Sequence, residues 1–165
     1  MEAYEEIVTA HAPALLRLAV MLTGQRQDAE DLLQSTLLKA ERHRGRLVDM
    51  GAPGAYLRRV MVNEHLSLGR TRLRRVATVS AERVPEPAAE DVTGVLDQRD
   101  EMWRRLATVP RQQRAVLVLR YYEDLPDAEI ARVLGVSEGT VRSNAFRGLA
   151  ALRAQLSSPE SLPPR

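Results

Sequence analysis

The chain has 165 residues, a length that suits one ordinary domain or two small helical ones, and its 44% apolar content is enough for a buried core. Cysteine is absent, which excludes disulfides, thiolate metal sites and cysteine nucleophiles. The formal net charge is only +2, so the distribution of charge along the chain is more informative than the total.

The composition of the N-terminus predicts that it is not a secretory signal. The first ten residues, MEAYEEIVTA, are acidic, whereas the corresponding part of a signal peptide is basic. The apolar run LAVMLTG that follows is too short to span a bilayer. We therefore expect a cytoplasmic protein that does not insert into a membrane.

The first third of the chain predicts helices. Apolar side chains recur at helical spacing from Tyr4 to Leu22. Pro13 is expected to divide or kink this segment, and Thr23-Gly24 to end it. The next stretch, QDAEDLLQSTLLKAERHRGRL, predicts a second helix that opens with carboxylates, as helix N-termini favour.

A loop and a third helix are expected next. The stretch RGRLVDMGAPG is rich in Gly and Pro and predicts a loop. The third helix should begin near Gly54 or Ala55 and end in the basic segment GRTRLRR. Its expected buried stripe consists of Leu57, Val60, Met61, His65 and Leu68.

Positive charge concentrates in this part of the chain. Residues 39–75 contain ten Lys or Arg against three acids, and four of the arginines fall within RTRLRR. A solvated helix face can carry such charge, but this density favours an anionic partner. The stretch that follows, VSAERVPEPAAEDVTG, is acidic.

The sequence predicts two domains. Residues 76–94 have no helical period and contain Pro85 and Pro87, so we expect a linker there. Helical spacing resumes over 95–156, and residues 157–165 are expected to be disordered. No strand pair, hairpin or repeat is indicated. The predicted fold class is all-α, with small helical domains at 1–75 and 95–156 joined by a flexible linker.

The stretch EIARVLGVSEGTVRSNAFRGL predicts a helix-turn-helix. Two helices that cross steeply need a small side chain at the crossing and a glycine with positive φ in the turn, roles that suit Ala131 and Gly135. Ser137 can cap the second helix. The expected apolar seam consists of Ile130, Leu134, Val136 and Val141.

The second helix of this motif carries candidate DNA contacts. A helical wheel places Val141 on the buried arc and leaves a guanidinium, hydroxyls, an amide and an aromatic ring on the other face and its flanks. These groups suit base edges, phosphates and thymine methyls in a major groove. The face could instead be merely solvated, and Phe146 could pack against the first domain or the preceding helix. The candidates are Thr140, Arg142, Ser143, Asn144, Phe146 and Arg147.

Together these motifs resemble bacterial RNA polymerase sigma factors. LPDAEIARVLGVSEGTVRSNAFRGLAALR is similar to region four, LTGQRQDAEDLLQSTLLKA to the polymerase-docking part of region two, and AYLRRVMVNEHLSLGRTRLRR to the helix that melts and reads the upstream core promoter element. The size and layout resemble the small extracytoplasmic-function sigma factors, in particular the sigma-E-like actinobacterial subgroup. The resemblance implies a subunit that directs promoter recognition and transcription initiation.

The resemblance implies two contacts with core RNA polymerase, one with its clamp helices and one with its flap. The acidic residues of this segment could instead simply stabilise the N-terminus of their helix, an alternative that applies chiefly to Asp28. Asp31 and Gln34 lie about one turn apart on a shared face, which favours a partner. The implied clamp-binding residues are Asp28, Glu30, Asp31, Leu32 and Gln34.

The resemblance also implies that the loop RGRLVDMGAPG captures a base flipped from the minus-ten strand, which requires a pocket and backbone clamps. Relatives carry aromatic residues in this loop, whereas this chain has none between residues 40 and 55, which leaves Tyr56 for stacking. The implied minus-ten residues are Arg44, Arg46, Asp49, Tyr56, Arg58, Arg59, Asn63, Arg70, Arg72, Arg74 and Arg75.

Two rival functions are less consistent with the sequence. A LuxR-type transcription regulator shares the motif EIA…SEGTV but needs neither DAEDLLQ nor RTRLRR. An enzyme is disfavoured because His11, His43 and His65 match no ligand spacing and no phosphate loop or serine elbow is present. We therefore expect no catalytic residue, metal, cofactor or small-molecule substrate. The expected partners are core RNA polymerase and promoter DNA, with an anti-sigma factor as a further candidate.

Overall fold

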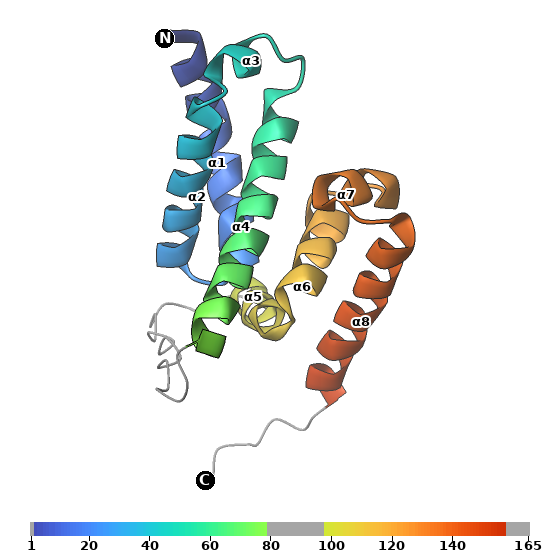
Figure 1. Cartoon of the computed structure of the whole chain (residues 1–165). Coiled ribbons are helices and arrows are strands. Elements are labelled where there is room, and N and C mark those ends of the chain that lie inside the picture. The colour runs from blue at the N-terminus through green and yellow to red at the C-terminus, as the bar shows by residue number, and fades with distance from the viewer. Residues whose placement is uncertain (1, 79–97, 158–165) are drawn as a thin grey trace.

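The structure is a computed structural model that describes residues 2–78 and 98–157, with side chains described for 2–71 and 101–156 (Figure 1). Over these ranges the backbone forms helices and no strand. The all-α prediction is confirmed. The elements are α1 (Glu2–Thr23), α2 (Arg26–Glu41), α3 (Arg44–Val48), α4 (Pro53–Thr78), α5 (Gln98–Thr108), α6 (Arg111–Leu117), η1 (Val118–Tyr122), α7 (Asp127–Leu134) and α8 (Glu138–Ser157).

The N-terminal domain is a three-helix bundle in which α1, α2 and α4 pack against one another and α3 lies at one end (Figure 1). Leu18 and Leu22 of α1 are fully buried, as are Leu57 and Met61 of α4. Burial of large apolar side chains at helical spacing is what stabilises the bundle. Lys39 of α2 also forms an ion pair with Glu64 of α4.

The first helix is continuous, so the predicted division at Pro13 is wrong. Pro13 is exposed, and the turns around it bury apolar side chains such as Leu15. Tertiary burial therefore compensates for the lost backbone hydrogen bond. The predicted end of this helix is confirmed: Gly24 adopts φ 77°, and its N–H donates to the Val20 carbonyl at 2.8 Å.

By length and composition alone, α1 could cross a membrane, the one such helix in the part of the chain that the structure describes. Its large apolar side chains are instead used in the bundle, where Leu18 and Leu22 contact the other helices. The positions left exposed are small or charged, such as Ala10, Ala14 and Arg17. Packing in the core of the bundle therefore accounts for the apolar composition of α1, and no membrane is needed to explain it.

Two predicted boundaries differ from the structure. The stretch expected to be a loop contains the short helix α3, which forms because Leu47 is fully buried under the bundle. Helix α4 begins at Pro53, one residue before the expected Gly54 or Ala55, and runs to Thr78, so it takes in the first residues of the expected linker. The rest of that linker, Val95 and Leu96, and the expected tail from residue 158 lie outside the described residues.

The C-terminal domain consists of α5, α6, η1, α7 and α8, with α8 packed across α6 and α7. Val116, Leu119, Ile130 and Val141 are fully buried in its core. Leu156, near the end of α8, is 63% exposed, because α8 extends beyond its neighbours.

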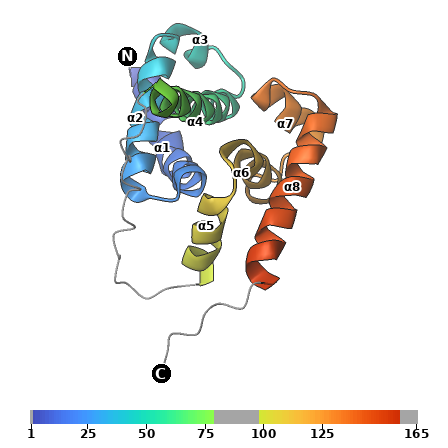
Figure 2. The same ribbon diagram turned by 60° about the horizontal axis from the view of Figure 1, so that its bottom comes forward.

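The two domains are in contact with each other. Figure 2 shows α6 beside α1 and α7 near α4; α6 contacts both α1 and α4, and α7 contacts α4. Arg114 of α6 is buried and donates a 2.6 Å hydrogen bond to the Leu22 carbonyl near the end of α1. Arg111 donates to the His65 carbonyl in α4 at 3.0 Å. The C-terminal domain is therefore anchored on the N-terminal bundle by side chains of α6.

Candidate nucleic-acid interface

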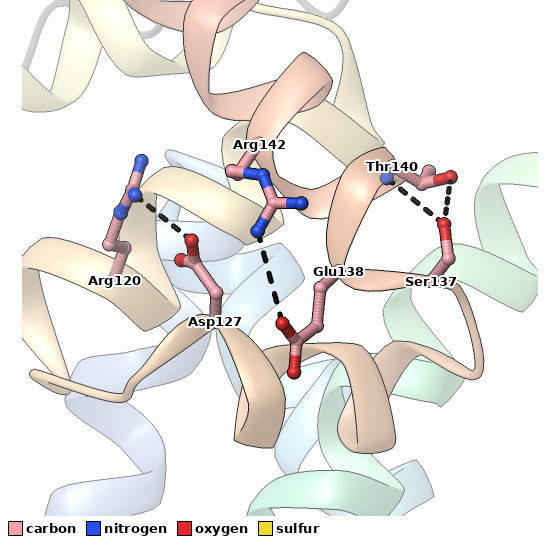
Figure 3. A network of polar contacts seen from close by, with 6 residues as sticks. All are labelled: Arg120, Asp127, Ser137, Glu138, Thr140 and Arg142. Atoms are coloured by element: carbon pink, nitrogen blue, oxygen red, sulfur yellow. Dashed lines mark hydrogen bonds and ion pairs between the residues drawn. The ribbon is translucent and has the colours of Figure 1, made fainter.

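The turn between α7 and α8 has the geometry predicted for a helix-turn-helix. Gly135 ends α7 in the left-handed conformation with φ 68°, and the Val136 N–H donates to the Ala131 carbonyl at 3.1 Å. Ser137 caps α8, because its Oγ accepts a 3.1 Å hydrogen bond from the Thr140 N–H (Figure 3). The predicted roles of Gly135 and Ser137 are confirmed.

One face of α8 is open to solvent. Arg142, Ser143, Phe146 and Arg147 line a shallow depression on it, and Thr140 is exposed at its start. Phe146 is 75% exposed, so the alternative in which it packs against another helix is wrong. An aromatic ring held out between two guanidinium groups has no role in the core of this protein.

Asn144 is placed differently from the sequence prediction. Its side chain is buried, with 9% exposure, and lies on the inner side of α8 with Val141 and Ala145. Asn144 follows Val141 by three residues, which places it about 60° from Val141 around the helix. The arc is wide because α8 packs against both α6 and α7. Asn144 is therefore not displayed to a groove.

Two ion pairs lie beside this face (Figure 3). Arg120 of η1 donates to the Asp127 carboxylate at 3.1 Å and so fixes the start of α7. Arg142 lies 3.8 Å from Glu138, one turn earlier on α8, with both side chains more than half exposed. An exposed pair of this kind is weak, so Arg142 remains able to exchange Glu138 for a phosphate or a base edge. The Arg120–Asp127 pair joins two elements and was not predicted from the sequence.

The predicted polymerase-binding residues occupy α2. Asp28, Asp31 and Gln34 are exposed, and Glu30 is half-buried beside Arg26 with an N–O distance of 3.1 Å. Leu32 differs, because it is 2% exposed and belongs to the core of the bundle. A leucine in this position cannot reach a partner protein.

The predicted minus-ten residues lie on α3, the loop after it and α4. Among the basic residues with described side chains, Arg44, Arg46, Arg59 and Arg70 are exposed. Asp49 is also exposed and Tyr56 is half-buried. Arg72, Arg74 and Arg75 lie in the last turns of α4, and their side chains are outside the described residues.

A cavity of about 350 Å³ opens beside α3. Arg44 lines it together with Tyr4 and Glu41, which sequence analysis did not single out. Tyr4 donates a 3.2 Å hydrogen bond to the Leu37 carbonyl, and burial, with Glu41 nearby, raises its pKa. Tyr4 and Glu41 are far apart in sequence and carry no common motif, so only the fold brings them together.

Two minus-ten candidates contact the C-terminal domain. Arg58 lies 3.1 Å from the Glu123 carboxylate, and both side chains are largely buried. Asn63 donates a 3.1 Å hydrogen bond to the Val133 carbonyl in the last turn of α7. The family resemblance implies a DNA-facing role for both residues, and neither contact was predicted from the sequence.

Comparisons with known proteins cover both domains. Residues 7–78 match the model of sigma-70 region 2, and residues 99–152 match that of sigma-70 region 4. The RNA polymerase sigma-E factor of Streptomyces avermitilis is 37% identical over 155 residues, which are 94% of this chain and 86% of that protein. The ECF sigma factor SigM of Mycobacterium tuberculosis is 34% identical over 156 residues, covering 91% and 75% of the two chains.

The chain belongs to the extracytoplasmic-function (ECF) family of RNA polymerase sigma factors. A solved structure agrees: the sigma factor RpoE of Bartonella quintana, in complex with the anti-sigma factor NepR, is 27% identical and superimposes with a TM-score of 0.70 over 97% of this chain and all of that one. As a sigma factor the protein directs promoter recognition in transcription initiation. The region 2 match excludes the LuxR-type alternative, because such a regulator has no polymerase-docking domain.

Proposed function

We propose that α8 reads the minus-thirty-five element in the major groove through Thr140, Arg142, Ser143, Phe146 and Arg147. The observation that carries this assignment is the depression on α8, where two guanidinium groups, a hydroxyl and an exposed ring lie on one face after a well-formed turn. Arg pairs with guanine edges or phosphates, and an aromatic ring suits a thymine methyl. Asn144 makes no contact with the minus-thirty-five element in this proposal, because its side chain is buried.

On the N-terminal domain, the exposed side chains of Asp28, Asp31 and Gln34 bind the clamp helices of core polymerase, with Glu30 at the edge. Acids and an amide on one helix face suit a basic partner. The C-terminal domain meets the flap. The minus-ten strand follows α3 and α4, where its phosphates meet the basic side chains and a base stacks on Tyr56. The proposed contacts are Arg44, Arg46, Asp49, Tyr56, Arg58, Arg59, Asn63, Arg70, Arg72, Arg74 and Arg75.

The protein works in the cytoplasm, where its polymerase and promoter are found, and catalyses no reaction of its own. An anti-sigma factor is a further partner. This is supported by the Bartonella relative, whose structure contains one.

The test is in vitro transcription with sigma-free core polymerase on a pooled promoter library. We expect RNA that starts at a defined subset of templates and falls steeply as salt rises, since phosphate contacts release counterions. Core polymerase alone is the control. If no template supports promoter-directed RNA under permissive conditions, the proposed function is wrong.

A further inference from the structure

The recognition helix α8 opens with an acid that is not among the proposed DNA contacts. Glu138 is the first residue of α8, and its carboxylate lies 3.8 Å from the Arg142 guanidinium, one turn later (Figure 3). Residues four apart share one side of a helix, so Glu138, Arg142 and Phe146 form a row along α8. The Glu138 side chain is 53% exposed, so its carboxylate is accessible to a partner.

A carboxylate on a surface that meets DNA requires an explanation. It repels the phosphates on either side of the groove, and it loses hydration when the helix enters the groove. An acid in the first turn does stabilise a helix, and so does an ion pair between residues four apart, but both effects are small on an exposed surface. They support the folding of α8 and do not offset the cost that arises on DNA.

The groups in the major groove decide which bases tolerate this carboxylate. An ionised carboxylate only accepts hydrogen bonds, and the donors in the groove are the amino groups of cytosine and adenine. Guanine and thymine present acceptor oxygens there, which repel it. In a helix-turn-helix the first residues of the second helix contact base edges. Glu138 therefore favours cytosine or adenine at one position and disfavours the other two bases.

Arg142 narrows this choice to one base pair. A guanidinium donates to O6 and N7 of guanine, and the N4 amino group of the paired cytosine lies next to that O6 in the same plane. The two oxygens of the Glu138 carboxylate can accept from this amino group and from Arg142 at the same time. Glu138 and Arg142 are already adjacent in the structure, so together they match the two halves of one G·C pair.

We propose that Glu138 is a specificity-determining residue of the minus-thirty-five site, whose carboxylate accepts a hydrogen bond from the cytosine of the G·C pair that Arg142 reads through its guanine. The proposal rests on the proposed function, which places α8 in the major groove. Glu138 also orients the Arg142 guanidinium through the ion pair. It lowers affinity for DNA in general and raises the ratio of specific to non-specific binding, because only the matched pair offsets the repulsion by phosphates.

The experiment uses holoenzyme formed from the full-length chain and core polymerase. The DNA is a promoter recovered from the pooled library and randomised over its minus-thirty-five element, and sequencing of the bound duplexes gives the base preference at each position. Wild type should select a G·C pair at the position that Arg142→Ala relaxes. Glu138→Gln should lower that preference about tenfold, because an amide both donates and accepts and so tolerates every base. No change at that position, or a change confined to another position, would overturn the proposal.

The affinity for unrelated DNA should change in the opposite sense. Glu138→Gln removes a negative charge from the face that meets the phosphates, so the affinity for duplexes of unrelated sequence should rise about threefold. A folding defect in α8 would lower this affinity, so the rise separates base reading from a structural role, and circular dichroism shows that the helices are intact. An unchanged or lower affinity for unrelated duplexes would contradict the proposed repulsion.

Glu129→Gln is the matched control. Glu129 is also an exposed acid in the first turn of its helix, α7, and the substitution removes the same charge. It should leave the base preference unchanged at every position. If it relaxed the G·C preference as much as Glu138→Gln does, the effect would come from net charge, and the proposed contact with cytosine would be refuted.

A double substitution tests whether the two side chains read one base pair. If they do, Glu138→Gln should relax the preference much less in the Arg142→Ala background than in wild type, because the guanine of the pair is no longer bound. Additive losses would show that Glu138 and Arg142 read separate base pairs, which would refute the shared G·C pair.

Transcription distinguishes this proposal from the function on which it rests. If the Glu138→Gln holoenzyme makes promoter-directed RNA and keeps the wild-type base preference, the proposal fails and the sigma function stands. If wild-type holoenzyme makes no promoter-directed RNA and selects no sequence, the proposed function fails, and base reading by Glu138 fails with it.

Discussion

Arg114 and Leu22 are 92 residues apart in the chain, yet the Arg114 guanidinium donates a 2.6 Å hydrogen bond to the Leu22 carbonyl. The same guanidinium donates to the carbonyls of Ala107 and Val109 at 2.8 and 2.9 Å. Burial, with Arg111 nearby, lowers the pKa of Arg114 to about 10, so it remains charged at neutral pH. One side chain thus joins the end of α1 to the turn that follows α5.

Replacing Arg114 with Met should lower the free energy of unfolding by about 2–4 kcal/mol, because three carbonyls, among them the buried carbonyls of Leu22 and Val109, lose a charged donor. Arg114→Lys should recover only part of this, since an ammonium group cannot reproduce the planar fork. Urea denaturation followed by circular dichroism measures the effect. Arg104→Met, at an exposed site of α5, is the control and should change stability by less than about 0.5 kcal/mol. Equal losses at both sites would contradict the role of Arg114.

His65 should make stability depend on pH. Burial, with Arg111 and Arg114 nearby, lowers the pKa of His65 to about 3, whereas an unfolded histidine titrates near 6.5. The folded state therefore holds the neutral ring, and stability is lost as pH falls below 6.5 toward 3. At pH 5 the loss should be about 2 kcal/mol.

The measurement is the unfolding free energy of wild type and His65→Phe at pH 7 and pH 5. Both proteins share the titration of the carboxylates, so the difference between their pH slopes isolates the histidine. Identical slopes would show that His65 does not titrate on unfolding.

Features fixed by local sterics could be predicted from the sequence, and features that depend on distant neighbours could not. The turn at Gly135 needs a positive φ, and the cap at Ser137 needs a hydroxyl three residues before a free N–H, so both leave a local signature. Asn144 and Leu32 were misplaced because their burial depends on how wide an arc each helix packs.

The contacts that two proposed minus-ten residues make with the C-terminal domain are the clearest case of information absent from the local pattern. The Asn63–Val133 and Arg58–Glu123 contacts join residues 70 and about 65 positions apart, and neither pair belongs to a periodic stripe. A sequence motif indicates which kinds of interaction a side chain can make with a partner. Whether that residue is free or occupied by another domain is a property of the tertiary fold.

Two glycines next to the recognition helix should respond oppositely to alanine. Gly135→Ala should lower the free energy of unfolding by about 1–2 kcal/mol, because a Cβ is disfavoured at φ 68°. Gly139→Ala should be neutral or stabilise by up to about 1 kcal/mol, since it lies in α8 and its Cβ would meet nothing closer than the Ser137 Oγ at 3.8 Å. Thermal and urea unfolding measure both. Similar effects at the two sites would contradict the left-handed turn.

Substitutions in the two domains should weaken binding to different partners: DNA for the C-terminal domain and core polymerase for the N-terminal domain. Arg142→Ala and Arg147→Ala should each weaken binding to a minus-thirty-five duplex by about 1–3 kcal/mol and leave the affinity for core polymerase unchanged. Asp31→Ala should weaken the polymerase complex about tenfold and leave duplex binding by the free protein unchanged. Fluorescence anisotropy with labelled duplex and with labelled polymerase measures the two affinities separately.

Matched exposed sites serve as controls for this separation of roles. Arg153→Ala lies on the same helix as Arg142 but outside the depression, and Glu6→Ala removes an exposed acid from α1. Neither should change either affinity beyond a factor of two. The salt dependence adds a further distinction: loss of a phosphate contact should reduce the slope of log affinity against log salt by about 1, whereas loss of a base contact should relax sequence preference at one position. If the Arg142, Arg147 and Asp31 variants all showed the same defect, the assignment of DNA to α8 and polymerase to α2 would be wrong.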